Sequence, residues 1–487
     1  MSGQAAERRI LSALHGRKSR THLAEILAQF VRHGLDQSNL VISHFAAVCS
    51  SLSRMRYARL LFDRMENPNI LLFNSMIRGY SQSGPFEESF RFFRNLQARE
   101  ISPDDFTFPP LLRASCELGS LCFGRGIHGQ IEKVGFNAEG AVQVGLVELY
   151  VGCEHMADAQ KVFDSMVRRN AIVWNVMIGG YFKSGNVGIA LKMFDQMVER
   201  TVVSWNVVIS GLAQKGLSDE ALEMFRKLCE QGTKPDDATI VAVLPVCAQL
   251  GALKLGRWIH EKVVENGHKQ NVSVMNALVD MYAKCGDLET ARSVFNEIPQ
   301  KNVISWNSMI MGFSINGQGE LAIKMFEEMK RSGTEPNSVT IIGVLTGCTH
   351  SGLVQTGREI FNSMERLHRI EPSLEHYGCM VDLLGRYGFL KEAHALIRSM
   401  PMKSNAAIWG ALLSACRLHG NVELAEGATN KLIELEPSNS GNYVLLSNIY
   451  AEAGQWDEAE KVRAMMKEMS IRKEPGNSAF SESVMVR

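Results

Sequence analysis

Apolar residues recur at helical spacing along most of this chain, and the pattern returns every 31 to 36 residues. In one such stretch Trp205, Val208, Ile209 and Leu212 share a single face of a helix. A glycine follows the stretch, and a second amphipathic stretch follows the glycine. The pattern predicts a helical hairpin that is repeated through nearly the whole sequence.

A glycine marks the turn of the hairpin at a fixed place in the repeat. It occurs at Gly84, Gly119, Gly185, Gly216, Gly251, Gly286, Gly317, Gly352, Gly388 and Gly420, and Glu154 fills the slot that the spacing leaves empty. Glycine readily adopts the left-handed conformation that ends many helices. A small residue such as Ala190 follows and allows close helix packing, and a phenylalanine such as Phe194 comes next. The longer units end in a proline that we expect to stop their second helix: Pro103, Pro235, Pro336 and Pro372.

One hairpin cannot bury its apolar face alone, so repeats of this kind must stack to form a continuous core. We therefore predict an all-α fold, a right-handed α-solenoid superhelix of helix-turn-helix repeats with a long concave surface. At 487 residues the chain would otherwise suggest about three domains. The repeat pattern indicates one quasi-linear array instead.

Composition and charge narrow the functions that such an array can have. Lys+Arg and Asp+Glu number 52 each, so the whole-chain basic excess typical of nucleic-acid binders is absent. A nucleic-acid site would have to be local and depend on stacking and hydrogen bonds. The ten cysteines form no CxxC pair, which excludes zinc ribbons and the zinc deaminase signature. No phosphate loop, GxSxG or HExxH motif occurs, so we expect neither an enzyme nor a cofactor.

The start of the chain is basic. It holds Arg8, Arg9, Arg17, Lys18 and Arg20 against the single acid Glu7. This bias is compatible with an organellar transit peptide, and equally with the basic face of a first helix. The longest apolar run, at 240–248, is far too short to span a membrane, so no membrane association is expected.

A tryptophan or phenylalanine followed by asparagine recurs in phase with the repeat, at Trp174-Asn175, Trp205-Asn206, Trp306-Asn307 and Phe73-Asn74. Repeat lengths cycle through 35, 35 and 31 residues, whereas tetratricopeptide repeats keep a fixed period of 34. The segments "VVSWNVVISGLAQKGLSDEALEMF" (202–225) and "NALVDMYAKCGDLETARSVF" (276–295) resemble the plant pentatricopeptide repeat family, specifically its P-L-S subclass. The resemblance covers most of the chain.

The resemblance divides the chain into segments. Residues 1–38 form a leader with a degenerate repeat, 39–405 the repeat array, 406–478 a pair of E motifs and 479–487 a tail. The expected units of the array are 39–69, 70–104, 105–139, 140–170, 171–201, 202–236, 237–271, 272–302, 303–337, 338–373 and 374–405. After Gly476 the sequence departs from the segment that leads related proteins into a DYW deaminase domain.

In this family one unit reads one base of single-stranded RNA through two side chains. The resemblance assigns these roles to residue five of the unit and to its last residue. The pairs are Ser43/Asn69, Asn74/Asp104, Asn175/Thr201, Asn206/Asp236, Asn276/Asn302 and Asn307/Asn337. By the family's code they favour A, U, a pyrimidine, U, C and C, from 5′ to 3′.

Other units depart from this code. Asn170 and Asn405 are expected to contact RNA, but their partners Val144 and Gly378 are unreadable, and the units 105–139, 237–271 and 338–373 carry apolar residues at position five. The base preference of these five units therefore stays open. Residue two of the unit is implied to sandwich the bases, here Leu71, Ile172, Val203 and Ile304.

Structural roles compete with these assignments. An asparagine at the start of a helix is commonly a cap, and only its recurrence in phase with the repeat favours RNA contact. His128 and His260 stand in a slot that phenylalanine occupies elsewhere, so we expect core packing and no metal site. The periodicity of Trp205 and its equivalents likewise favours packing between repeats over stacking on bases.

We therefore predict an organellar factor that selects sites for C-to-U RNA editing and recruits a deaminase in trans through its E motifs. The alternatives are an RNA-binding factor for splicing, stability or translation, and a helical protein–protein scaffold. The E subclass favours the mitochondrion, with the plastid as alternative. We expect a monomer in the absence of RNA.

Overall fold

The computed structural model describes residues 35–468 except 266 and 268–270, together with a few residues between 23 and 32. It is built from helices alone in this part of the chain, as the sequence predicts. The basic stretch at the start and the tail 479–487 lie outside the described residues, and so do the predictions on them. The helices group into two compact parts, Met1–Lys234 and Pro235–Arg487.

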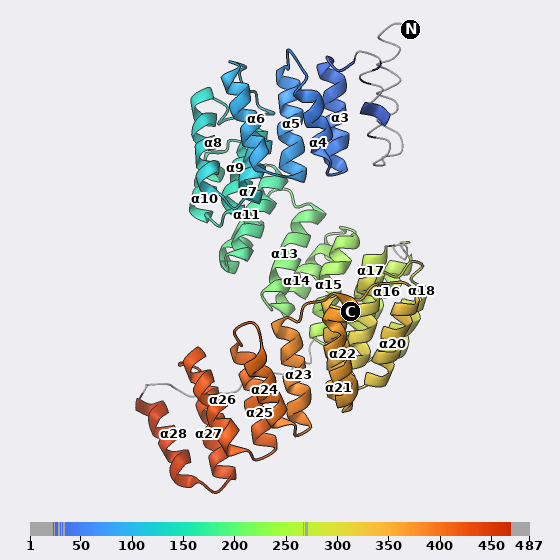
Figure 1. Cartoon of the computed structure of the whole chain (residues 1–487). Helices are drawn as coiled ribbons and strands as arrows, with labels where there is room; N and C mark the ends of the chain where they lie inside the picture. Colours follow the sequence, from blue (N-terminus) through green and yellow to red (C-terminus); the bar gives the residue numbers. More distant parts are fainter. Residues whose placement is uncertain are drawn as a thin grey trace. The chain divides into compact units, whose positions relative to one another are not determined.

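Among its described residues the first part contains six helix pairs, most of whose helices are labelled in Figure 1. They are α3 (Asn39–Ser51) with α4 (Met55–Phe62), α5 (Ile70–Ser83) with α6 (Glu87–Ala98), α7 (Phe108–Glu117) with α8 (Leu121–Val134), α9 (Gly140–Gly152) with α10 (Met156–Ser165), α11 (Ala171–Lys183) with α12 (Val187–Gln196), and α13 (Val202–Gln214) with α14 (Ser218–Glu230).

The second part contains seven pairs among its described residues. They are α15 (Asp237–Gln249) with α16 (Leu253–Glu265), α17 (Val272–Lys284) with α18 (Leu288–Glu297), α19 (Val303–Ile315) with α20 (Gly319–Arg331), α21 (Ser338–Ser351) with α22 (Val354–His368), α23 (Leu374–Arg386) with α24 (Leu390–Ser399), α25 (Ala406–Leu418) with α26 (Val422–Leu435), and α27 (Ser440–Glu452) with α28 (Trp456–Glu468).

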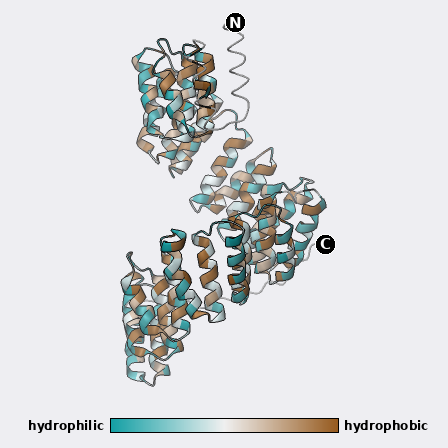
Figure 2. Cartoon of the chain, turned by 45° about the vertical axis from the view of Figure 1, so that its right-hand side comes forward, coloured by the Kyte–Doolittle hydropathy of each residue, from teal (hydrophilic) through white to brown (hydrophobic). Residues whose placement is uncertain are grey.

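Within each part the first helices of successive pairs pack side by side. In the first part they run α3, α5, α7, α9, α11 and α13, and in the second α15, α17, α19, α21, α23 and α25. Each helix carries both hydrophobic and hydrophilic residues, as Figure 2 shows, because one side faces its neighbours and another faces solvent. Equivalent positions of successive first helices therefore lie in one layer, where the sequence predicts the RNA-reading residues.

The turn positions have the backbone conformation that the sequence predicts. All ten repeat glycines have positive φ, between 58° and 86°. Glu154, which replaces glycine in this slot, also has positive φ, at 63°. The structure adds Ser53, with φ of 52°, in the same slot of the repeat at 39–69. The turn geometry thus persists where a side chain replaces glycine, because the packing of the two helices holds it.

The prolines at the ends of the longer units do not stop the second helices, contrary to the expectation. The helices α14 and α20 end at Glu230 and Arg331, several residues before Pro235 and Pro336. A glycine with positive φ follows each helix, Gly232 at 71° and Gly333 at 78°. The backbone therefore leaves the helix at the glycine, and the proline lies in the extended segment that leads to the next repeat.

Aromatic pairs link successive repeats. The phenylalanine of one repeat meets the tryptophan of the next edge-to-face, with ring centroids 4.8 Å apart in Phe194–Trp205 and 5.1 Å apart in Phe295–Trp306. A cation covers the other side of the phenylalanine, as Arg200 does over Phe194 at 4.8 Å. The two tryptophans are 2% and 6% exposed, so the prediction that they pack between repeats is confirmed.

Glycines inside the first helices permit their close approach. A Cβ on Gly312 of α19 would lie 2.6 Å from the Cβ of Ala283 on α17. Such a distance is closer than carbon atoms can pack, so a larger residue here would force the helices apart. The spacing of the first-helix layer therefore depends on this glycine and on its equivalents.

The last helix pair attaches differently. The helix α25 still packs on α23, but α27, apart from its own partner α28, packs mainly on α26, the second helix of the preceding pair. Among the described residues, the regular layer of first helices therefore ends with α25. No helix in the described part of the chain is long and apolar enough to cross a membrane.

One buried histidine joins two repeats in the second part. His376 is fully buried at the start of α23, and its Nδ1 accepts a hydrogen bond from the backbone N–H of Ser373 at 3.1 Å. Its Nε2 lies 3.1 Å from the carbonyl oxygen of Ser338 on the preceding first helix and is placed to donate to it. Both contacts suit the neutral ring, and burial lowers the pKa of His376 below its usual value.

We expect Trp306→Ala to destabilise the second part by about 3–5 kcal/mol, because it leaves a cavity against Phe295. Urea unfolding followed by circular dichroism measures this. The matched control is Ile304→Ala on the same helix, because Ile304 is 58% exposed. The control should change stability by about 0.5 kcal/mol or less. Similar losses in the two variants would contradict the packing role of the tryptophan.

Acid should weaken the second part. The folded state resists protonation of His376, while the unfolded chain takes up a proton near pH 6.5. The stabilisation is therefore complete above about pH 6.5 and is lost as the pH falls below it. His376→Gln can keep the capping contact but cannot titrate. Thermal melts between pH 7.5 and 5 should show a smaller loss of melting temperature for this variant, and equal losses would refute the assignment.

Candidate nucleic-acid interface

The last residue of most predicted units caps the first helix of the next unit. Its side-chain oxygen accepts a hydrogen bond from a backbone N–H in the first turn, at 2.8–3.3 Å. The residues are Asn69, Asn170, Thr201, Asp236, Asn271, Asn302, Asn337 and Asn405. Capping therefore fixes the position of these side chains at the repeat junctions, whatever else they do.

Three of the predicted pairs are joined directly by hydrogen bonds. Asn74 donates through Nδ2 to both carboxylate oxygens of Asp104, at 2.8 and 3.0 Å. Asn307 donates to Oδ1 of Asn337 at 3.1 Å. Asn276 donates to Oδ1 of Asn302 at 3.3 Å. The two members of each pair are about thirty residues apart in sequence, and the stacking of repeats brings them together.

A hydroxyl group completes two of these junctions. Thr107 lies within hydrogen-bonding distance of both Asn74 and Asp104, with Oγ1 2.8 Å from each Oδ1. Thr340 stands in the same relation to Asn307 and Asn337, at 2.6 and 3.0 Å. The sequence reasoning missed these threonines. Their regular position was the available signal, because each stands directly before the dipeptide that corresponds to the aromatic-asparagine pair of other units.

The other predicted pairs differ. The Ser43 hydroxyl donates to the carbonyl oxygen of Asn39 on its own helix at 2.7 Å, and no hydrogen bond joins it to Asn69. Oδ1 of Asn175 is buried without a hydrogen-bond partner. Asn206 lies in the first part of the chain and Asp236 in the second, so their pairing stays a prediction.

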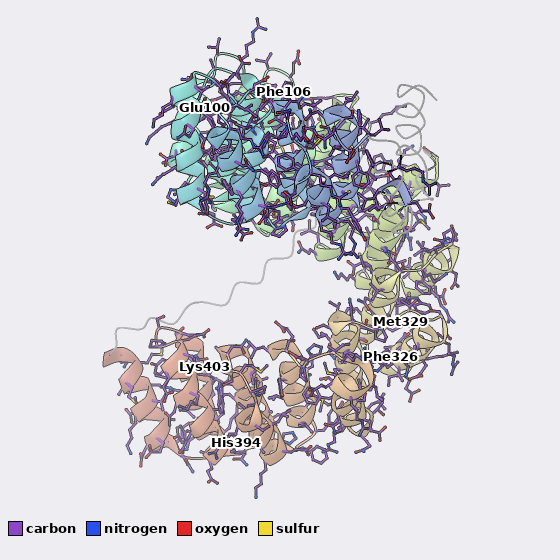
Figure 3. The ribbon with its side chains drawn as sticks, turned by 45° about the horizontal axis from the view of Figure 1, so that its top comes forward. Glu100, Phe106, Phe326, Met329, His394 and Lys403 are labelled. Atoms are coloured by element: carbon purple, nitrogen blue, oxygen red, sulfur yellow. The ribbon has the colours of Figure 1, made fainter. Side chains whose placement is uncertain are left out.

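The residues predicted to sandwich bases are exposed apolar side chains. Leu71, Ile172, Val203 and Ile304 are 46%, 59%, 56% and 58% exposed. Residue two is also an exposed apolar side chain in three further units, at Leu40, Phe106 and Val339. Figure 3 labels Phe106 at the surface of the first part. Exposed apolar side chains can pack against the face of a nucleic-acid base.

His128 and His260 lie between repeats and are only partly buried. Nδ1 of His128 lies 2.7 Å from the hydroxyl of Tyr150, and Nδ1 of His260 lies 3.0 Å from the hydroxyl of Tyr282. A cavity of about 320 Å³ is lined by His128 and by Arg125 and Asp158, which form an ion pair at 3.0 Å. In the described residues no group of three potential ligands could hold a metal ion.

Family models match most of the helix pairs. A model described as "PPR repeat family" matches residues 68–117, 200–249 and 301–350. A second, "PPR repeat", matches 172–202, 273–303 and 375–404. Each of these matches begins one residue after the start of the corresponding predicted unit. A third, "E motif", matches 419–481 and so overlaps the predicted E motifs at 406–478.

Curated relatives cover nearly the whole chain. A pentatricopeptide repeat-containing protein of Arabidopsis thaliana is 51% identical over 98% of this chain and 99% of its own length. Two further Arabidopsis proteins of that description are named chloroplastic and mitochondrial. The first is 44% identical and covers 94% of this chain and 82% of its own length. The second is 38% identical and covers 96% and 67%.

The fold also matches a solved structure. The crystal structure of the maize pentatricopeptide repeat protein PPR10 aligns with 94% of this chain and 78% of its own, with a TM-score of 0.54 at 19% sequence identity. At this identity the likeness establishes the fold alone. Together with the relatives and the matched repeats, it shows that this chain belongs to the pentatricopeptide repeat family and carries a C-terminal E motif.

Proposed function

We propose that this protein is a sequence-specific binder of single-stranded RNA in a plant organelle. Family membership supports this, because pentatricopeptide repeats read RNA one base per repeat. The observation that carries the proposal is the hydrogen-bonded reader pair at the repeat junctions, as in Asn74 with Asp104. This pair presents an amide and a carboxylate, and residue two of the same unit, Leu71, is an exposed apolar side chain.

The bound sequence follows from the family's code. The units 39–69 and 70–104 favour A and U, and the units 171–201 and 202–236 favour a pyrimidine and U. The units 272–302 and 303–337 both carry two asparagines and favour C. The proposed unit boundaries assign each capping side chain to the base of the unit that it ends.

We further propose that RNA binding selects a cytidine for C-to-U editing. The array positions the transcript, and a separate deaminase-bearing protein supplies the chemistry. The E motif supports this proposal, as do exposed apolar side chains on its helices, Leu418 and Trp456, each 67% exposed. Such groups on a helical surface suit a protein partner.

The organelle is proposed from the same relationship. Relatives are named mitochondrial or chloroplastic. Because the E subclass favours mitochondria, we propose the mitochondrion, with the plastid as alternative. Sequencing of organellar transcripts from plants lacking this protein tests the editing role, and unchanged C-to-U editing at every site would exclude it.

RNA binding itself is tested with the purified full chain and a randomised single-stranded RNA pool. Sequencing of the bound fraction should show A-U, then a pyrimidine-U three positions later counting the unread units 105–139 and 140–170, then C-C after one further unread base. The order follows the order of units along the chain. A pool bound without preference at these positions would overturn the reader assignment.

Asn337→Asp should change base preference without loss of fold. Asp caps a helix as well as Asn does, so the hydrogen bond from the N–H of Thr340 is kept. By the family's code the base at unit 303–337 should shift from C to U. The expected change in the ratio of C to U is about tenfold, measured by competition between two RNAs that differ at this base.

The matched control for this substitution is Asn421→Asp. Asn421 caps α26 through the N–H of Leu424 but lies on a second helix, outside the predicted reading positions. It should leave RNA preference unchanged. An identical preference in wild type and Asn337→Asp would remove Asn337 from the set of readers.

Salt should weaken binding only modestly. The net charge of zero leaves no general basic excess, and the proposed contacts are hydrogen bonds and stacking. We expect a salt dependence equivalent to two or three phosphate contacts, a slope of about −1.4 to −2.1 in log K against log salt for a single strand. Fluorescence anisotropy between 50 and 300 mM KCl, about a sixfold range, measures it. A slope near −7, about ten phosphates, would refute this mechanism.

A further inference from the structure

The third residue of the following unit carries a hydroxyl at four of the repeat junctions whose two units lie within one part of the chain. It is threonine at Thr107 and Thr340, and serine at Ser204 and Ser305. At three of these four positions the hydroxyl and the preceding capping residue form a reciprocal capping box, the exception being Thr107. The four junctions differ in whether the hydroxyl also reaches the asparagine at position five of the preceding unit.

At the threonine junctions the hydroxyl reaches that asparagine. Oγ1 of Thr340 lies 2.6 Å from Oδ1 of Asn307 and 3.0 Å from Oδ1 of Asn337. Oγ1 of Thr107 makes the equivalent contact with Oδ1 of Asn74 at 2.8 Å. The acceptor oxygen of the reading asparagine is therefore occupied at both junctions.

At the serine junctions the same oxygen has no partner. The Ser305 hydroxyl donates to Oδ1 of Asn302 at 3.1 Å, and Oδ1 of Asn276 is buried without a hydrogen bond. Asn276 is 5% exposed, and among the described residues no side chain donates to this oxygen. Oδ1 of Asn175, at the Ser204 junction, is in the same state. An unpaired buried acceptor is unfavourable, and a ligand that donates to it removes that cost.

Capping fixes the orientation of the asparagine amide at both kinds of junction. Oδ1 of Asn302 accepts from the N–H of Ser305 at 3.0 Å, so it presents an oxygen to Asn276. Asn276 must then turn its Nδ2 toward Asn302, which leaves its own Oδ1 on the other side. The same reasoning holds for Asn337, which accepts from the N–H of Thr340 at 3.0 Å.

We propose that the third residue of the following unit is a positioning residue that decides which atom of the reading asparagine is open to the base. This inference rests on the proposed RNA-binding function. With serine, the open Oδ1 accepts from a base with an amino group, cytosine or adenine. With threonine, Oδ1 is occupied and the amide offers only its remaining N–H, which suits a carbonyl group such as that of uracil.

Two units make this proposal distinct from the family's two-residue code. Units 272–302 and 303–337 carry the same reader pair, Asn with Asn, and the code assigns C to both. Ser305 follows the first and Thr340 follows the second. We therefore expect the first unit to prefer C over U more strongly than the second. The methyl group of threonine is the physical difference, because it restricts χ1 to fewer rotamers than serine can adopt.

The experiment uses the full chain and a randomised single-stranded RNA pool, and compares the ratio of C to U at these two bases in the bound fraction. In the wild type the ratio should be about fivefold higher at unit 272–302, the effect of one neutral hydrogen bond. Thr340→Ser should raise the ratio at unit 303–337 about fivefold, and Ser305→Thr should lower it at unit 272–302 by a similar factor.

The control variant is Thr349→Val on the same helix as Thr340. Its hydroxyl is buried and bonds only to the carbonyl oxygen of Leu345 on its own helix, so base preference should not change. Thr340→Ser keeps the capping hydroxyl, and a merely structural role would alter the melting temperature or the affinity for all RNAs alike. A shift of the ratio at one base alone distinguishes the positioning role.

The outcomes separate this proposal from the proposed function. If the wild type binds RNA with the expected motif and both swaps leave the two ratios unchanged, the positioning role is wrong and the RNA-binding function stands. If the wild type selects no RNA from the pool, both fall together. The two swaps act on different junctions, so misfolding of one variant still leaves the other to decide.

Discussion

The capping of most first helices by the last side chain of the preceding repeat is the constraint on which this structure depends. The first amide groups of any helix have no partner within it, and most junctions here supply one. Asn302 and Asn337 do so through their side-chain oxygens. Because such a cap must be a short polar residue, the junctions carry the side-chain types that can also bond to the edge of a base.

Because capping and base contact call for the same residue types, a single asparagine at a junction does not by itself indicate RNA contact. Asn170 and Asn405 cap α11 and α25 with the same geometry as Asn337, yet the residues at position five of their units are Val144 and Gly378. Capping alone explains both. A reading role is better supported where the cap also bonds to a polar residue at position five, as Asn337 does with Asn307.

The fold was predictable from the sequence because the repeat is local. Helix periodicity, the turn glycine and the Phe–Trp contacts all depend on residues within one repeat or its neighbour, and even the substitution of Glu154 at the turn was evident. The ends of the second helices were not predictable from the sequence, because a proline such as Pro235 gives the end of a helix only approximately. Ser53 escaped notice since a serine gives no signal of positive φ.

The site was predictable only in part. The family's positions identified Asn74 and Asp104, but not that they bond to each other or that Thr107 joins them. Those contacts link residues about thirty positions apart, and their distances depend on how closely one repeat stacks on the next. The family's code uses two positions per repeat, so it takes no account of a third side chain that belongs to the following repeat.

At the end of the array the stacking of the helices changes, although side-chain capping continues. The layer of first helices continues through α25, and α27 then packs on α26 and on its own partner α28. Asn439 still caps α27, through the N–H of Gly441, but this cap follows a helix that does not belong to the same layer. Side-chain capping therefore continues beyond the layer in which the reader pairs are proposed to lie. Trp456, at the start of α28, is 67% exposed outside that layer, and an exposed apolar side chain of this kind suits the proposed protein partner.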